Sequence, residues 1–319
     1  MFAVRFDTQL QLDHDAPRPE PCADEAIIRV LRAGICSTDL ELCKGYMEYS
    51  GILGHEFVGI VEQTDGGTGL EGCRVVGEIN AACHQCETCR AGRPTHCHHR
   101  TVLGIQGRDG TFAEFVRLPA RNLYPLSRTL SDDQAVFIEP LAAACEIPQQ
   151  VDIHPADRIV VIGDGKLGLL CAQVLRLTGC SVSLLGHHTE RNTWLRKLGI
   201  AITSHPRDIP CGADIVVEAT GTHEGFALAS DCVRPRGIIV LKSTYQGTLT
   251  LNMAKIVIDE ISLVGSRCGP FGPAIRLLEQ GLIQVEPMIH AHYPLHNGLA
   301  AFEHAATPGV LKVILRMDY

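Results

Sequence analysis

Several features that mark particular protein classes are missing from this sequence of 319 residues. No apolar run approaches the roughly 18 residues that suggest a membrane span, and the start MFAVRF has no secretion-leader pattern. Basic residues are not in excess, since 28 Lys and Arg face 36 Asp and Glu for a net charge of −8. We therefore expect a cytoplasmic protein that binds neither nucleic acid nor an anionic membrane surface.

Cysteine, in contrast, is abundant, and four of the 14 cysteines are regularly spaced in CHQCETCRAGRPTHC, residues 83–97. In a reducing compartment, closely spaced cysteines usually bind metal as thiolates, because disulfides are kept reduced. Four sulfur ligands suit tetrahedral zinc and leave no open position for a substrate; an iron–sulfur cluster is the alternative. The pattern predicts a structural zinc held by Cys83, Cys86, Cys89 and Cys97. The nearby histidines are interpreted as solvated loop residues: His84, His96, His98 and His99.

The chain is long enough for two domains, and its pattern changes along its length. Up to about residue 125, short strands are broken by Gly and Pro, which predicts a β-rich domain with strands at 26–36, 57–63, 73–79 and 111–119. From about residue 158, apolar strands alternate with helices, which is typical of an α/β fold with a doubly wound parallel sheet. The expected strands are 158–163, 181–186, 214–221, 237–243 and 261–266, with helices after the first strand to 178 and at 189–198.

The end of the chain mixes helix and strand again. A helix is expected near 273–280 and short strands near 288–293 and 310–316. We therefore expect three segments: 1–130, 131–270 and a tail, 271–319, that returns to the first domain. Between Gly199 and Asp214, Pro206 and Pro210 oppose the helix expected of a crossover, so a loop is predicted there.

A glycine-rich turn follows the first strand of the second domain in VVIGDGKLGLL. Gly163, Gly165 and Gly168 have the G-x-G-x-x-G spacing that permits a tight turn, close approach to a pyrophosphate and helix–strand packing. The following helix offers its N-terminal amides to the phosphates. The turn predicts dinucleotide binding, with Lys166 as a candidate contact to the pyrophosphate; a merely tight strand–helix turn and a solvated lysine are the alternatives.

The end of the second strand of such a sheet distinguishes NAD from NADP. A carboxylate at that position binds the ribose 2′-hydroxyl of NAD and repels the 2′-phosphate of NADP. Here the strand ends in Gly186, followed by His187, His188 and Arg191. Without an acid at this position and with potential cations nearby, the sequence predicts a preference for NADP(H), which Gly186→Asp would reverse or erase. The alternative is that the histidines are solvated and the preference is loose.

Two further motifs lie in the first domain and one near its boundary: GICSTDLELC (34–43), GHEFVG (54–59) and IEPLAAACE (138–146). With the cysteine loop and the glycine turn, they make the chain, from about residue 22 to 316, resemble the zinc-containing medium-chain dehydrogenase/reductase family, which includes alcohol and polyol dehydrogenases. The resemblance implies a GroES-like catalytic domain beside a Rossmann domain. It also implies a zinc-dependent alcohol dehydrogenase or carbonyl reductase that uses NAD(P)(H), two zinc ions per chain and a small alcohol or carbonyl substrate.

The same resemblance assigns the catalytic zinc ligands. Cys36 and His55 match family ligands, Glu139 matches the polyol and threonine dehydrogenases, and Glu56 is a labile fourth ligand that yields to water or substrate. Such a site keeps the exchangeable position that catalysis requires. Thr38 matches the hydroxyl that relays the substrate proton, and Asp39 is placed to orient a ligand imidazole.

Some positions depart from the family pattern. Glu41 stands where relatives often have the histidine of an outer proton relay, and Cys73 replaces a usual aspartate. Two other functions remain open: a zinc-independent enone or quinone reductase on the same fold, and a non-catalytic nucleotide or redox sensor. The apolar strand at 261–266 would lie at a sheet edge and invites pairing between chains. As family members pair in this region, a homodimer or homotetramer is expected.

Overall fold

A computed structural model describes residues 1–65, 67–209, 211–244, 248–249 and 251–317. The chain forms two compact units, one of residues 1–139 and 271–319 and the other of residues 140–270. The tail therefore belongs to the same unit as the N-terminal segment, and that unit continues to Glu139, beyond the expected boundary at residue 130. In the described part of the chain, no helix is long and apolar enough to cross a bilayer.

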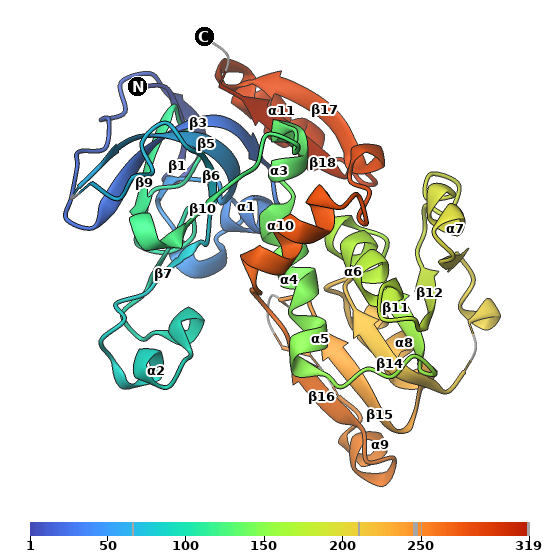
Figure 1. The fold of residues 1–319 in the computed structure, drawn as a ribbon. Coiled ribbons are helices and arrows are strands. Elements are labelled where there is room, and N and C mark those ends of the chain that lie inside the picture. The colour runs from blue at the N-terminus through green and yellow to red at the C-terminus, as the bar shows by residue number, and fades with distance from the viewer. Residues whose placement is uncertain (66, 210, 245–247, 250, 318–319) are drawn as a thin grey trace. The chain divides into compact units, whose positions relative to one another are not determined.

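The first unit is built on β-sheets (Figure 1). Its largest sheet has the order β10-β6-β5-β3-β18-β17, with β9 also paired to β3, and two smaller sheets have the orders β2-β1-β4 and β7-β8. The strands of the large sheet are β3 (Glu25–Gly34), β5 (Glu56–Thr64), β6 (Arg74–Gly77), β9 (Phe115–Pro119), β10 (Leu123–Pro125), β17 (Ile289–Pro294) and β18 (Lys312–Arg316). The others are β1 (Ala3–Phe6), β2 (Leu10–Asp13), β4 (Gly51–Ile52), β7 (Asn80–Ala81) and β8 (Thr101–Val102). Since β18 pairs antiparallel with β3, the C-terminal strand completes a sheet begun near the N-terminus.

Short helices of the first unit position its side chains. They are α1 (Ser37–Leu42), α2 (Glu87–Arg90), α3 (Asp132–Ala135), α10 (Phe271–Glu279) and α11 (Gly298–Ala305), and α4 (Ile138–Cys145) begins at the end of this unit. Helix α3 begins with a capping box, in which Ser131 and Gln134 each accept a hydrogen bond from the other's backbone N–H. Helix α1 follows β3 directly, so the residues at its start lie at the end of a long, mostly buried strand.

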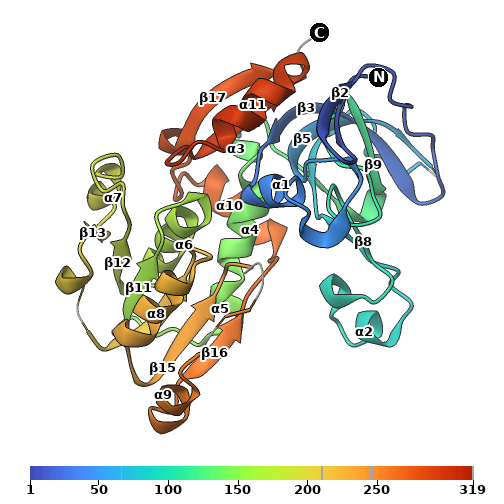
Figure 2. The same cartoon turned by 180° about the vertical axis from the view of Figure 1, so that it is seen from behind.

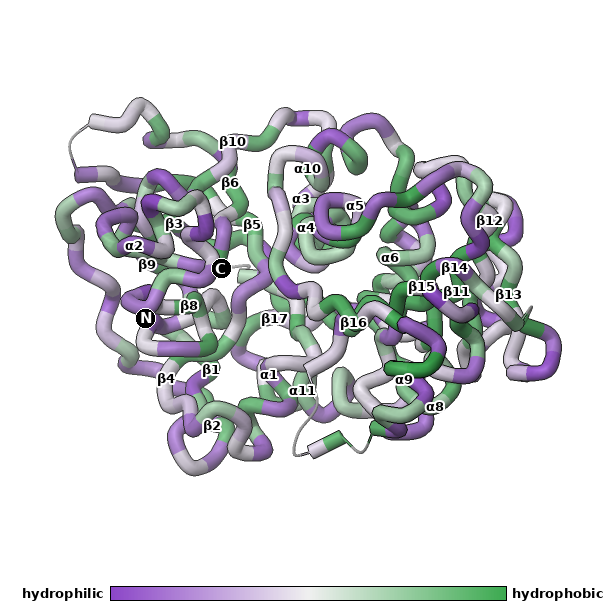
Figure 3. The backbone as a smooth tube through the Cα atoms, turned by 90° about the horizontal axis from the view of Figure 1, so that it is seen from below, coloured by the Kyte–Doolittle hydropathy of each residue, from purple (hydrophilic) through white to green (hydrophobic). Residues whose placement is uncertain are grey.

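The second unit is a six-stranded parallel sheet in the order β13-β12-β11-β14-β15-β16, the predicted doubly wound arrangement. Its strands are β11 (Arg158–Ile162), β12 (Ser181–Leu185), β13 (Ala201–Thr203), β14 (Ala213–Glu218), β15 (Val233–Leu241) and β16 (Ser262–Gly265). Its helices are α5 (Ile147–Gln150), α6 (Lys166–Arg176), α7 (Trp194–Lys197), α8 (His223–Cys232) and α9 (Met253–Ile258). Figure 2 shows the sheet from behind, and Figure 3 shows hydrophobic residues along its strands. Val160, Val216 and Ile239 are at most 2% exposed, as strands covered on both faces require.

The structure corrects one predicted element of the second unit and confirms another. The helix expected at 189–198 is formed only as α7, because residues 189–193 are turns. The connection from β13 to β14 contains a 3₁₀ turn, Pro206–Asp208, in place of a helix, as the prolines predicted. Pro210 lies outside the described residues.

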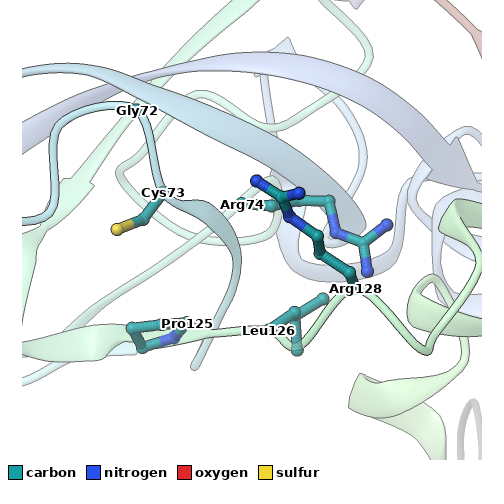
Figure 4. Close-up of a pocket in the computed structure, with 6 residues that line it drawn as sticks. All are labelled: Gly72, Cys73, Arg74, Pro125, Leu126 and Arg128. Carbon is teal, nitrogen blue, oxygen red and sulfur yellow. The ribbon is translucent and has the colours of Figure 1, made fainter.

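A surface pocket in the first unit is lined by Gly72, Cys73, Arg74, Pro125, Leu126 and Arg128 (Figure 4). The sulfur of Cys73 points away from the guanidinium groups of Arg74 and Arg128 in this view. Arg74 is held by Asp132 and by the carbonyl oxygens of Ser127 and Leu130. None of the predicted site residues lines this pocket, so we assign it no function.

Candidate active site and metal centres

The four cysteines of the 83–97 loop converge in the structure. Their sulfur atoms all lie within 4.8 Å of one another, with Cys86 3.5 Å from Cys89 and 3.7 Å from Cys97, and Cys97 3.4 Å from Cys83. Zn–S bonds of about 2.3 Å in a tetrahedron separate sulfurs by about 3.8 Å, so this cluster has nearly the size that zinc needs. All four are free cysteines, which agrees with a metal site rather than a disulfide.

Backbone amides surround these sulfurs. Cys97 Sγ accepts from the N–H groups of Cys83 and His99, and Cys83 Sγ accepts from the N–H of Gln85. The N–H of Cys89 lowers the pKa of Cys86 to about 6, and the N–H of Gln85 lowers that of Cys83. Because these amides stabilise the thiolate form, they favour binding of a cation by the loop. Burial and the hydrogen bond with Cys86 raise the pKa of Cys89 to about 12, so the sulfurs of this cluster differ in how readily they lose their protons.

A second cluster joins Cys36, His55 and Glu56, whose ligand atoms also lie within 4.8 Å of one another. Cys36 is the N-cap residue of α1. Glu56 is the first residue of β5, which pairs with β3, and His55 directly precedes it. Gly54 precedes them with φ +98°, and a Cβ there would meet the ring of Phe112 at 2.5 Å. His55 and Glu56 are 3% and 1% exposed and Cys36 is partly buried, so the cluster is a mostly buried set of N, O and S donors suitable for zinc.

Asp39 organises this cluster from within the core. Its carboxylate accepts hydrogen bonds from the N–H groups of Cys36 (2.8 Å) and Gly54 (3.2 Å), and its Oδ1 lies 3.3 Å from His55 Nδ1. The predicted orientation of the imidazole by Asp39 is therefore present, and Nε2 is the nitrogen left for a metal. Burial opposes a charged imidazole, but Asp39 and Cys36 together outweigh it and raise the pKa of His55 well above its usual range.

Glu56 has a buried partner that the sequence reasoning missed. Lys312 of β18 donates a hydrogen bond to Glu56 Oε2, and neither side chain is more than 1% exposed. A Cβ at Gly34 would lie 2.7 Å from Glu56 Oε2 and 3.0 Å from Lys312 Cδ, so only glycine leaves room for this pair. The signal in the sequence is a lysine inside an apolar strand, VLKVIL (310–315).

The other residues with a predicted part in catalysis differ in how closely they are associated with this cluster. Glu139, at the start of α4, is outside the compact ligand group, although its charge interacts with His55 and Glu56. Burial, with repulsion from Glu56, raises the pKa of Glu139 to about 7. Thr38 Oγ1 lies 3.8 Å from Cys36 Sγ. Glu41 has a side chain that is 40% exposed and pairs with Lys44, on the solvent side of α1.

In the second unit, the glycine turn has the geometry of a nucleotide loop. Gly163 has φ +110°, and a Cβ there would meet the carbonyl oxygen of Ala219 at 2.8 Å, while at Gly168 it would overlap the Gly163 carbonyl. At Gly165, the N-cap of α6, a Cβ would meet nothing within 4 Å. The fold itself does not require glycine at 165, so this open space fits the close approach of a pyrophosphate.

The premise of the predicted NADP(H) preference is corrected by the structure. A carboxylate does lie at the end of β12, but it belongs to Asp164 of the glycine turn. A Cβ at Gly186 would lie 2.6 Å from Asp164 Oδ2. Gly186→Asp would therefore clash with an acid that is already present, and this single substitution cannot test cofactor preference. His187 and His188 are exposed, and Arg191 is partly buried.

Comparisons with known proteins agree with both units. The alcohol dehydrogenase GroES-like domain family matches residues 22–128, and the zinc-binding dehydrogenase family matches residues 167–280. Sorbitol dehydrogenase of Halalkalibacterium halodurans is 31% identical, with 94% of each chain covered. The chain belongs to the zinc-containing medium-chain dehydrogenase/reductase family.

Solved structures of this family are also similar over the whole chain. A zinc-binding dehydrogenase of Sinorhizobium meliloti bound to NADP is 28% identical, with a TM-score of 0.89 and 99% and 98% of the two chains covered. An alcohol dehydrogenase of Escherichia coli complexed with NADH is 25% identical, with a TM-score of 0.89 and 99% of each chain covered. The fold is thus found with either nicotinamide cofactor, and family membership alone does not decide between them.

Proposed function

We propose that this protein is a zinc-dependent, NAD(P)(H)-linked dehydrogenase that transfers hydride between nicotinamide and a small alcohol, polyol, aldehyde or ketone. The observation that carries the proposal is the buried cluster of Cys36, His55 and Glu56, organised by Asp39, in a chain that also has an open glycine turn. Dehydrogenase activity on CH–OH groups agrees with the named relatives. The direct test is to assay a panel of alcohols and carbonyl compounds with both cofactors, with the reaction rate measured from the change in nicotinamide absorbance.

The side chains of the cluster divide the chemistry among them. Zinc held by these side chains would supply Lewis-acid polarisation of the substrate oxygen, which favours loss of the hydroxyl proton, and a nicotinamide cofactor would supply or accept the hydride. Cys36 and His55 would hold that ion, with Glu139 as the third ligand and Glu56 as the exchangeable one. Thr38, beside Cys36, is the hydroxyl that would pass the proton onward. Glu41 or water would take it to solvent.

Glu56 is suited to an exchangeable role because it has two possible partners. It belongs to the compact ligand group, and it is also paired with Lys312. A carboxylate that shares its charge with a lysine is a weaker zinc ligand than a free one, because the ammonium group withdraws electron density from it. Substrate or water can then replace it without leaving a buried carboxylate uncompensated.

Two zinc ions of different lability are expected per chain. The cysteine loop closes its shell with four sulfurs, whereas the Cys36 cluster keeps an open position to which a chelator can bind. Mild chelation followed by metal analysis should remove about one equivalent and abolish turnover while the far-ultraviolet circular dichroism is unchanged. Full activity with one zinc ion or none contradicts the assignment.

The same measurements separate two alternative functions. A zinc-independent enone or quinone reductase would keep its activity after chelation, and a non-catalytic nucleotide or redox sensor would bind cofactor without turning over any substrate. The buried donor set of Cys36, His55 and Glu56 has no role in the first alternative and disfavours it.

The cofactor preference predicted from the sequence was NADP(H), because an acid was missing after the second strand. The position of Asp164 removes that premise. Only the nicotinamide cofactor as a class is therefore part of this proposal. A cytoplasmic location remains a prediction from the sequence.

An oligomer, most simply a homodimer, is part of the proposal. Strand β16 ends the order of the six-stranded sheet, and three exposed apolar side chains lie on it or on α9: Leu263, Val257 and Ile258 are 36%, 69% and 78% exposed. An apolar edge strand favours pairing with a second chain. Light scattering at micromolar concentration should give at least twice the monomer mass, and Leu263→Lys should lower it. A monomer at that concentration contradicts this expectation.

A further inference from the structure

The glycine turn and the turn after β12 are joined by one side chain, Asp164. Its Oδ2 accepts hydrogen bonds from the backbone N–H of His188 (2.7 Å) and from Asn192 Nδ2 (3.2 Å). Its Oδ1 lies 3.4 Å from His188 Nδ1. Only 9% of the Asp164 side chain is exposed, so these contacts hold the carboxylate in one place.

The Asp164 carboxylate occupies the space that a side chain at position 186 would need, and residue 186 is glycine. A Cβ added to Gly186 would overlap the Asp164 side chain, so the two positions cannot both carry an acid in this conformation. Gly186 is buried and is the first residue after β12. The acid that many dinucleotide-binding sheets place at the end of the second strand is thus supplied here by the turn after the first strand.

Arg191 and His188 are the basic side chains that interact with this carboxylate. Arg191 interacts electrostatically with Asp164, but burial outweighs that interaction and lowers the pKa of Arg191. The imidazole of His188 is 42% exposed beside Oδ1. A carboxylate offers about four lone-pair sites, and the contacts above engage Oδ2 more fully than Oδ1. Oδ1 therefore retains acceptor capacity for a hydroxyl.

We infer that Asp164 selects the cofactor by accepting a hydrogen bond from the adenosine ribose 2′-hydroxyl, so that the protein prefers NAD(H) to NADP(H). The inference rests on the proposed function. A pyrophosphate at Gly165 and the start of α6 brings the ribose to the end of the second strand, where this carboxylate is fixed. A 2′-phosphate at that point would place a second anion beside a carboxylate that has little access to water. The nearby cation Arg191 already interacts electrostatically with Asp164.

The test is direct binding rather than turnover. Isothermal titration of NADH and NADPH into the zinc-loaded protein should show NADH binding at least tenfold more tightly. Asp164→Asn keeps an oxygen for the His188 N–H but removes the charge, and should reduce the NADH/NADPH affinity ratio by about tenfold to a hundredfold. Lys166→Met is the matched control in the same turn, because loss of a pyrophosphate contact weakens both cofactors to a similar extent.

A double variant keeps the test independent of local folding defects. Asp164→Gly alone should lose the preference for NADH. Asp164→Gly with Gly186→Asp should regain it, because a carboxylate then occupies the same space from the turn after β12. Thermal melting identifies variants that are unfolded. A wild-type preference for NADPH, or equal effects of Asp164→Asn on both cofactors, overturns this inference and leaves the proposed function standing. A folded protein that binds neither cofactor overturns both.

Discussion

Replacing Cys36 with serine is expected to lower kcat/KM by about a thousandfold or more, with little change in the far-ultraviolet circular dichroism. Cys36 supplies the sulfur ligand of the cluster with His55 and Glu56. A zinc ion held at this site would supply several kcal/mol of charge stabilisation in the transition state, and about 4 kcal/mol corresponds to a thousandfold in rate. Steady-state assays combined with zinc analysis should show that one of two zinc equivalents is lost.

The control for this prediction is Cys22→Ser. Cys22 is an exposed free cysteine and belongs to neither cluster, so its replacement should change neither activity nor zinc content. If Cys36→Ser retains full activity with two zinc equivalents, the cluster does not hold the catalytic ion.

Replacing Lys312 with methionine is expected to destabilise the protein by about 3–5 kcal/mol, because it leaves Glu56 buried without its partner charge. Lys312 is fully buried, and its ammonium group also lies 5.4 Å from the ring centroid of Phe137. Methionine has a similar length, so the loss is mainly electrostatic rather than a cavity. Denaturant unfolding of the metal-free and zinc-loaded proteins gives the difference in the free energy of unfolding.

Two further variants decide whether the ion pair is the cause. Lys312→Met with Glu56→Gln removes both charges and should recover most of the lost stability. Lys44→Met breaks the exposed pair with Glu41 and should change the free energy of unfolding by less than about 1 kcal/mol. A single Lys312→Met variant as stable as the wild type shows that Glu56 does not need this charge.

The contacts that the sequence predicted and the structure contains are those that depend on local spacing. Cys83, Cys86, Cys89 and Cys97 lie within one loop, so their spacing alone predicts that one ion can reach all four. Asp39 follows Cys36 by three residues at the start of α1, where the helix turn brings its carboxylate back to the Cys36 N–H. In the same way, Gly163 and Gly168 mark a turn whose backbone excludes other side chains.

Glu139 remains a ligand predicted from the resemblance. Its position in the EPL motif predicts a zinc ligand, and its charge does interact with His55, but it lies outside the compact group that contains Glu56. Which carboxylate completes a metal site depends on the direction of a side chain at the start of α4. A motif specifies the residue type and not that direction.

The sequence by itself determined the two-part α/β architecture, the close approach of four cysteines in one loop and the glycine turn after β11, because hydrophobic periodicity and short-range spacing act within a few residues. Only the tertiary structure decided that Lys312 neutralises Glu56, a pair separated by 256 positions, and that Asp164 fills the space beside Gly186. The first pair joins β5 and β18, two strands of one sheet that are distant in the sequence, and the second joins the turns that follow the neighbouring strands β11 and β12. The physical reason is burial: a charge enclosed by the fold must find its partner in space, and the partner's distance along the chain is not constrained.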